Sequence, residues 1–229
     1  MESFFTNCDV IHFNNEEEWH KLRGQGIGGS DAGIIMNVSQ YCTPYELWEQ
    51  KCGIVERPFI TNEAIEKGNA LEPLMINLFK IFYKDKYEVV DTKSISLVSK
   101  KYPFMRANLD GALIEKSTGR KGILEIKSTT IQNGLMFKHW GKDDMPILYF
   151  FQCLHYLIVT KFDFVVLYGI LDIPWKGDIG EQETRAIIIN REDVLEDMRL
   201  LLEDEKSFWN KVVNKIPPPF LESRNKNLM

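Results

Sequence analysis

Apolar residues in the first half of the chain follow a helical spacing. Residues 62–83 carry apolar side chains such as Leu71, Leu74 and Leu78, which predicts one long helix. A shorter helix with an acidic first turn is predicted over 15–23. The segment 43–46 (TPYE) is a capping box with proline at the first helical position, and it opens a helix that ends near residue 53. Ser30, after the glycine-rich loop 24–29, is expected to cap one more helix.

The middle of the chain changes to strand-like runs. Segments 87–90, 95–98, 107–114 and 122–127, separated by turn residues, predict successive strands. A helix over 146–160, strands over 164–171 and 184–189, and a final helix over 192–213 follow. This order predicts an α+β (mixed α/β) layered fold. At 229 residues, we expect a single domain over 1–229 that ends in a polar tail from the prolines at 217–219 to residue 229.

Composition narrows the class of protein. The chain is 44% hydrophobic and 12% aromatic, values typical of a globular protein. No run approaches the roughly 18 apolar residues that span a bilayer, and no basic stretch followed by an apolar one opens the chain. We therefore expect a cytoplasmic protein without a membrane partner, located in the host-cell cytoplasm or nucleoid if it is viral. The four cysteines lack metal-binding spacing and are interpreted as small apolar residues.

The formal net charge of −5 argues against a protein that coats DNA indiscriminately. Acidic and basic residues are clustered, however, with basic pairs at 100–101 and 120–121. Phosphate binding needs only a locally basic surface, so a single DNA-binding groove stays open.

Two neighbouring predicted strands carry the candidate chemistry. Strand alternation places Glu125 and Lys127 on one side and Ile126 in the apolar layer. On its own such a pair is most simply a structural ion pair, but Asp110 in the preceding predicted strand adds a second carboxylate. Two carboxylates and a backbone carbonyl are enough to hold Mg²⁺, and Lys127 can orient or deprotonate a water. Glu72, on the long helix, would by itself be a solvated helix residue.

A second candidate site is the loop before residue 30. The guanidinium of Arg23 offers fork-shaped donors to phosphate, and Ser30 adds a hydroxyl at a helix start. Glycines at 26, 28 and 29 allow the backbone to approach an anion closely. Taken alone, the segment is more simply a glycine-rich turn into a helix.

At this point the sequence resembles the YqaJ and phage lambda exonuclease branch of the PD-(D/E)xK nuclease superfamily. The resemblance spans residues 19–169 and rests on six segments in order. These are Arg23 followed by GIGGSDA (26–32), TPYELW (43–48), GNALEP (68–73), ANLDG (107–111), GILEIKS (122–128), and YFFQ (149–152) with His155 and Tyr156. It implies a restriction-endonuclease-like core with a central mixed sheet flanked by helices.

The resemblance also implies residue roles. Asp110, Glu125 and the Ile126 backbone carbonyl match the metal ligands, for Mg²⁺ with Mn²⁺ as a substitute. Lys127 matches the catalytic lysine. The remaining matches are Glu72 and Gln152 at the catalytic centre, and Trp19, Arg23, Ser30 and Asn108 at the pocket for a 5′-phosphate.

The implied activity is a 5′→3′ exonuclease that degrades one strand of linear double-stranded DNA from 5′-phosphorylated ends. It implies a homotrimer ring and a single-strand annealing protein as partner in recombination. The alternatives are an endonuclease on the same core, a Cas4-like iron–sulfur nuclease, and a catalytically silent DNA-binding module. No cysteine follows Cys153, which disfavours the iron–sulfur enzyme. The silent module would be expected to lack Asp110, Glu125 or Lys127, and all three are present.

Other conspicuous residues receive simpler interpretations. His155 is expected to be a packed or hydrogen-bonded core histidine. Lys138 and Lys142 fit a solvated surface as well as they fit contacts to DNA. Most of the aromatic cluster is expected to be core, namely Phe137, Trp140, Tyr149, Phe150 and Phe151.

Overall fold

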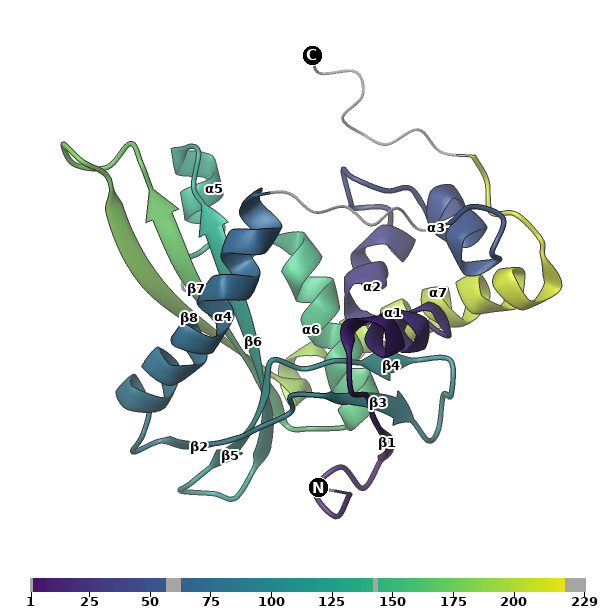
Figure 1. Cartoon of the computed structure of the whole chain (residues 1–229), viewed down its shortest axis with the longest axis horizontal. Coiled ribbons are helices and arrows are strands. Elements are labelled where there is room, and N and C mark those ends of the chain that lie inside the picture. The colour runs from purple at the N-terminus through teal and green to yellow at the C-terminus, as the bar shows by residue number, and fades with distance from the viewer. Residues whose placement is uncertain (1, 57–62, 142–143, 221–229) are drawn as a thin grey trace.

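The computed structural model describes residues 2–56, 63–141 and 144–220, and a five-stranded mixed sheet organises them (Figure 1). Its strand order is β2-β5-β6-β7-β8, with β6 parallel to β7 and the other pairs antiparallel. The strands are β2 (Tyr87–Val90), β5 (Gly111–Glu115), β6 (Lys121–Thr130), β7 (Phe164–Ile173) and β8 (Glu181–Asn190). The predicted α+β class with a central mixed sheet is confirmed.

A second, three-stranded sheet was not expected from the sequence. Its order is β1-β3-β4, formed by β1 (Cys8–His12), β3 (Ile95–Ser99) and β4 (Arg106–Ala107). The prediction of one strand over 107–114 is therefore wrong. The chain leaves strand geometry at 108–110, because β4 pairs in the small sheet and β5 pairs in the large one. This break carries Asp110.

Helices cover both faces of the large sheet. Helix α4 (Glu63–Phe82) packs Met75 and Phe79 on one face, against Leu124 and Ile126 of β6. Helix α6 (Ile147–Thr160) lies on the opposite face. Successive residues of β6 thus face different helices, which places Ile126 in the apolar layer as predicted and turns Glu125 towards α6.

The N-terminal helices gather on the side of α6 away from the β7–β8 hairpin (Figure 1). They are α1 (Glu16–Gly24), α2 (Gly29–Ile35) and α3 (Pro44–Lys51), with α7 (Leu195–Asn214) packed against α2, α3 and α6. The short helices α5 (Gly134–Lys138) and η1 (Arg191–Val194) complete the described elements. Neither α5 nor β1 was predicted from the sequence, because both are too short to show a helical or strand periodicity.

Helix ends test the predicted caps. Thr43 caps α3 in a reciprocal capping box with Glu46, as predicted. Ser30 does not cap α2, because the extended residue Gly28 takes the cap position and binds Asp31. Ser30 lies in the first helical turn instead, which frees its hydroxyl for another partner.

The remaining predictions divide by location. The long helix is confirmed from Glu63, whereas residue 62, Lys142 and residues 221–229 of the tail lie outside the described residues. Cys8 and Cys153 are buried apolar residues, as predicted. No helix within the described part of the chain is long and apolar enough to cross a membrane.

Candidate active site

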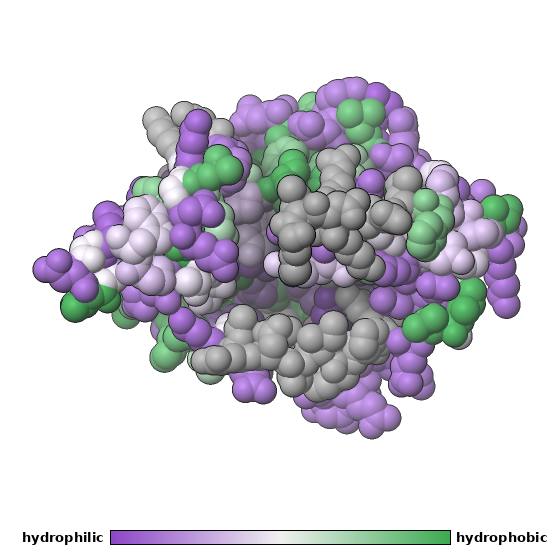
Figure 2. All heavy atoms as spheres, turned by 90° about the horizontal axis from the view of Figure 1, so that it is seen from above, coloured by the Kyte–Doolittle hydropathy of each residue, from purple (hydrophilic) through white to green (hydrophobic). Residues whose placement is uncertain are grey.

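One cavity of about 620 Å³ collects the candidate side chains from both predicted sites. Its lining comes from α1, α2, α4, β6, α6 and the segments 92–95 and 108–110. Seen from above, the surface is hollowed between the part that holds the β7–β8 hairpin and the part that holds α3 and α7 (Figure 2). Nine of the ten predicted site residues line this cavity, namely Trp19, Arg23, Ser30, Glu72, Asn108, Asp110, Glu125, Lys127 and Gln152, whereas Ile126 is not among the lining residues.

Asp110 is positioned by the end of a strand ladder. The pairing of β5 with β6 stops at Gly111 and Leu124. The next amide of β6 that points towards the β5 edge, on Ile126, therefore has no partner in β5. The Asp110 carboxylate accepts this N–H at 2.7 Å from Oδ2 to N. In an extended strand the carbonyl of a residue lies on the same edge as its N–H. The Ile126 carbonyl therefore shares the edge that Asp110 occupies.

Glu125 is the most buried acid of the site, with its side chain 2% exposed. Its Oε1 forms an ion pair with Lys127 Nζ and accepts a hydrogen bond from Gln152 Nε2 at 2.5 Å. Its Oε2 is buried and accepts no hydrogen bond from any described residue. The carboxylate is thus oriented through one oxygen and open at the other.

Burial raises the pKa of all three acids of the site, and the charge of Asp110 adds to the rise at Glu72 and Glu125. Burial and the charge of Asp110 raise the pKa of Glu125 to about 8. Burial also raises the pKa of Asp110, although Lys127 and the Ile126 N–H oppose the rise. For Glu72, burial and the charge of Asp110 raise the pKa. Three carboxylates with raised pKa values in one cavity disfavour full ionisation unless a cation joins them.

The pKa of Lys127 is also raised, which for a lysine favours the charged form. Burial by itself lowers its pKa, but the charges of Glu125 and Asp110 outweigh burial and raise the pKa above its ordinary value. Lys127 is therefore a firmly held ammonium rather than a free base at neutral pH.

The donor set fits a hard divalent cation. The Glu125 oxygen without a partner, the Asp110 carboxylate and the Ile126 carbonyl are oxygen donors, and Mg²⁺ completes its shell with water. In the described part of the chain no three histidine, cysteine or acidic side chains converge on one point. The predicted set of two carboxylates and one carbonyl is consistent with this, because it does not need a third acidic ligand.

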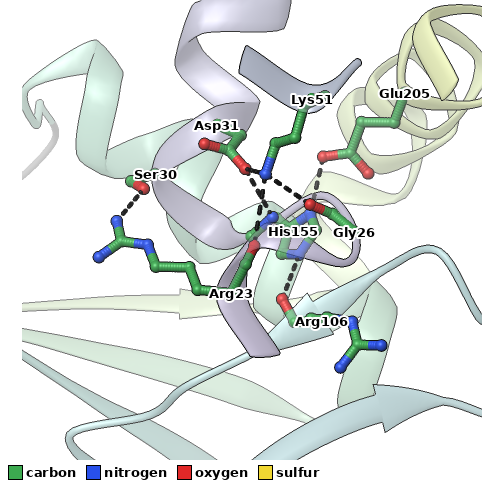
Figure 3. Close-up of polar contacts among 9 residues, drawn as sticks. Arg23, Gly26, Ser30, Asp31, Lys51, Arg106, His155 and Glu205 are labelled. Atoms are coloured by element: carbon green, nitrogen blue, oxygen red, sulfur yellow. Dashed lines mark hydrogen bonds and ion pairs between the residues drawn. The ribbon is translucent and has the colours of Figure 1, made fainter. Parts of the chain in front are cut away.

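Arg23 and Ser30 meet at another part of the cavity, as Figure 3 shows. Arg23 lies in the last turn of α1 and Ser30 in the first turn of α2, and Arg23 Nη2 donates to Ser30 Oγ at 2.7 Å. The guanidinium carbon lies 5.0 Å from the ring centroid of Trp19, one helical turn earlier. Stacking on Trp19 restricts the arginine rotamers, which preorganises its donors.

Tyr156 joins the two parts of the cavity, and sequence reasoning gave it no role. Its hydroxyl donates to the Asn108 carbonyl at 3.0 Å and accepts from Gln152 Nε2 at 3.1 Å. A side chain at Gly29 would meet the Tyr156 ring at 2.5 Å, so the glycine permits close contact between α2 and α6. The second glycine of the GGS motif was the available signal, but its partner is distant in sequence.

His155 is a buried structural histidine, as predicted. Its Nδ1 lies 2.7 Å from Glu205 Oε1 and its Nε2 lies 2.8 Å from the Arg106 carbonyl (Figure 3). Burial lowers its pKa, but Glu205 and the Arg106 carbonyl outweigh burial and raise it. The aromatic prediction is clearest for Trp140, which is 3% exposed, while the four others are half-buried against the core.

A mixed sheet that presents Asp110 and Glu125-x-Lys127 at one end is the core of the PD-(D/E)xK nucleases. In the solved structure of the alkaline exonuclease LHK-Exo from Laribacter hongkongensis the fold is similar, with a TM-score of 0.60 and 18% identity over 87% of this chain and 94% of that one. For LHK-Exo in complex with dAMP the TM-score is 0.65 at the same identity and coverage.

The family follows from sequence comparison. Residues 18–163 match the model of the YqaJ-like viral recombinase domain. The uncharacterized protein YqaJ of Bacillus subtilis (strain 168) is 35% identical over 214 residues, which are 90% of this chain and 60% of that protein. This chain belongs to the YqaJ-like viral recombinase domain family. It spans about 60% of the length of the curated relative that it matches.

Proposed function

We propose that this protein is a metal-dependent 5′→3′ exodeoxyribonuclease that degrades one strand of linear double-stranded DNA from 5′-phosphorylated ends. A single cavity of about 620 Å³ is lined both by the acids and lysine suited to phosphodiester hydrolysis and by the Arg23–Ser30 pair suited to a terminal phosphate. An enzyme that recognises an end and cuts beside it needs both in one cavity.

The roles of the catalytic residues follow from their contacts. Asp110, Glu125 and the Ile126 carbonyl would hold Mg²⁺, with Mn²⁺ as a substitute. Such an ion supplies charge stabilisation at the scissile phosphate and a more acidic bound water. Gln152 fixes the orientation of the Glu125 carboxylate through the 2.5 Å hydrogen bond.

Lys127 and Glu72 complete the proposed centre. As an ammonium, Lys127 orients the attacking water and balances the negative charge that develops on the phosphate. Glu72 reaches the same cavity from α4, on a wall that also includes Lys93, and its raised pKa reflects burial and the charge of Asp110. Glu72 therefore helps to fix the water and the metal shell.

The proposed end specificity rests on Arg23. Its guanidinium offers several N–H donors in a fork that matches phosphate oxygens, and Trp19 and Ser30 hold it in place. Asn108, two residues before Asp110 in the sequence, also lines the cavity, and we assign it to the same pocket. Removal of nucleotides from the 5′ strand leaves 3′ single-stranded overhangs for recombination by strand annealing.

The family relationship supports further proposals on assembly. The proposed active form is a homotrimer ring around duplex DNA, working with a single-strand annealing protein. The proposed location is the cytoplasm, or the host-cell cytoplasm or nucleoid for a viral protein. Light scattering of the purified protein tests the ring, and a stable monomer at working concentration would contradict it.

The central experiment compares three duplex substrates: 5′-phosphorylated linear, 5′-hydroxyl linear and closed circular DNA, each with Mg²⁺ and with EDTA. We expect metal-dependent release of nucleotides from linear DNA, fastest with the 5′-phosphate, and no cutting of circles. Failure to degrade any linear substrate, or equal cutting of circles, contradicts the proposal. Equal cutting would instead support an endonuclease on the same core.

Two variants test the separate roles proposed for the catalytic centre and for the 5′-phosphate pocket. Lys127→Ala should abolish cleavage while DNA binding persists, because its ammonium acts on the reacting groups. Arg23→Ala should mainly reduce the preference for 5′-phosphorylated ends. Lys80→Ala, an exposed lysine of α4 outside the cavity lining, is the control for loss of one positive charge. Near-normal cleavage by the first variant or unchanged preference in the second contradicts these assignments.

A further inference from the structure

A buried ion pair lies behind the loop that connects Arg23 to Ser30. Lys51 Nζ at the end of α3 is 2.7 Å from Asp31 Oδ2 in α2, and the two side chains are 3% and 0% exposed (Figure 3). Neither residue lines the cavity. Their charges therefore do not contact a ligand there, and another role must explain their burial.

The pair holds the loop through three backbone groups. Lys51 Nζ donates to the Gly26 carbonyl at 2.5 Å and to the Arg23 carbonyl at 3.4 Å. The Asp31 oxygen that binds Lys51 also accepts the Gly28 N–H at 2.9 Å. An ammonium has three N–H donors, and these contacts use all of them. The loop is thus fastened at its beginning, middle and end.

The opposite side of the loop is fixed by backbone pairing. Ile27 N donates to the Phe104 carbonyl at 2.7 Å, and Arg106 N donates to the Ile27 carbonyl at 2.8 Å. A side chain at Gly26 would lie 2.5 Å from the Phe104 oxygen, so the loop and this strand are already in close contact. The loop has no room to shift towards Phe104, and Lys51 opposes movement the other way.

We propose that Lys51, acting with Asp31, is a positioning residue for the 5′-phosphate pocket and so determines the preference for phosphorylated ends. This inference rests on the proposed function. Arg23 lies in the last turn of α1 and Ser30 in the first turn of α2, so only residues 25–28 set the separation of the two helix ends. Buried ion pairs are weak contributors to stability compared with apolar residues of similar volume, which leaves geometry as the main consequence of this one.

The test separates positioning from stability. Lys51→Met removes the ammonium that faces the buried Asp31 carboxylate, whereas the double variant Asp31→Asn/Lys51→Met removes both charges and should recover much of the lost stability. The measurement is the ratio of kcat/KM for 5′-phosphorylated over 5′-hydroxyl linear duplex. We expect both variants to lose at least about tenfold in this ratio, chiefly through KM for the phosphorylated substrate, since displacements near 1 Å in such sites have large effects.

A matched control distinguishes a general loss of stability. Leu201→Ala removes buried side-chain volume from the core at α7, away from the residues that line the active-site cavity. It should lower the thermal midpoint without changing the ratio of kcat/KM for the two substrates. A double variant that recovers stability and also keeps the wild-type ratio overturns the inference. So does a control that loses the ratio to the same extent.

A DNA-free readout keeps the inference testable if the proposed function fails. If the wild-type protein does not cleave linear DNA, or shows no preference for a 5′-phosphate, the proposed function is refuted. The inference that Lys51 and Asp31 position the loop is not. In that case amide hydrogen exchange at Ile27 decides. We expect exchange at least about tenfold faster in the double variant than in Leu201→Ala, because the loop has lost its fastening. Equal exchange overturns the inference.

Discussion

Replacement of Gly29 by alanine should lower both the stability and the cleavage activity of this protein, although helix propensity alone predicts a gain in stability. Gly29 lies in the first turn of α2, where alanine is better than glycine by up to about 1 kcal/mol in a helix interior. The added Cβ would lie 2.5 Å from Tyr156 Cε1 and 2.7 Å from Cζ, well inside the 3.4 Å at which ordinary contact begins. The ring must therefore move by close to 1 Å.

Tyr156 cannot yield without loss. Its side chain is buried, and its hydroxyl is fixed by the Asn108 carbonyl and by Gln152. Overpacking of this kind costs about 1–3 kcal/mol. Each broken hydrogen bond adds about 0.5–1.5 kcal/mol. Because Gln152 also orients Glu125, we expect cleavage to fall by about 10- to 100-fold, in line with the effect of a misplacement near 1 Å.

The neighbouring glycine provides the control. A Cβ at Gly28 would meet only Asp31 Oδ2, at 3.8 Å, so Gly28→Ala should cost less than about 1 kcal/mol, mainly through the weaker cap. Urea unfolding gives the stability of each variant, and nucleotide release from 5′-phosphorylated duplex gives the activity. If Gly29→Ala is as stable and as active as Gly28→Ala, the close contact with Tyr156 does not position the site.

Three further perturbations test separate parts of the structure. In EDTA, the free energy of unfolding should fall as the pH rises from about 4.5 to about 8. The pKa of Glu125 in the folded protein exceeds its ordinary value, so in this pH range the native state keeps a proton that the unfolded state releases. Glu125→Gln should flatten this pH dependence in thermal melts. Glu205→Gln removes the carboxylate that raises the pKa of His155, so we expect a cost of about 3–5 kcal/mol in acidic solution, where the imidazole is protonated, and a smaller cost as the pH rises and His155 loses its proton. A pH-independent cost in urea titrations would show that the histidine is neutral throughout. Thr43→Ala should cost about 0.5–2 kcal/mol by removing the cap of α3, and no change in the urea midpoint would contradict the capping role.

Local patterns in the sequence were enough to predict most helices and the faces of the central strand. The capping box at Thr43 fixes the start of α3 through contacts within three residues. Alternation in β6 separates Glu125 from Ile126 because successive side chains leave a strand on opposite faces. These features depend on neighbours that are adjacent in sequence, so the residues alone determine them.

The same locality explains where prediction failed. A run of apolar residues over 107–114 has the pattern of one strand, yet pairing divides it between two sheets and leaves 108–110 between them. Ser30 has the composition of a helix cap, but the hydrogen bond between Gly28 and Asp31 starts the helix earlier. In both cases a partner chosen by the fold outweighed a local preference.

The amino-acid sequence specifies the acids, the lysine and the arginine, and its local patterns predict the elements that carry most of them. Only the tertiary structure brought Arg23 and Ser30 into the same cavity as Glu125, and joined the two parts through Tyr156. It also fastened the intervening loop with Lys51, which no motif singled out. The physical reason is that these contacts join residues far apart in the chain, and they exist only once the packing of α2, α3 and α6 on the sheet has set their distances.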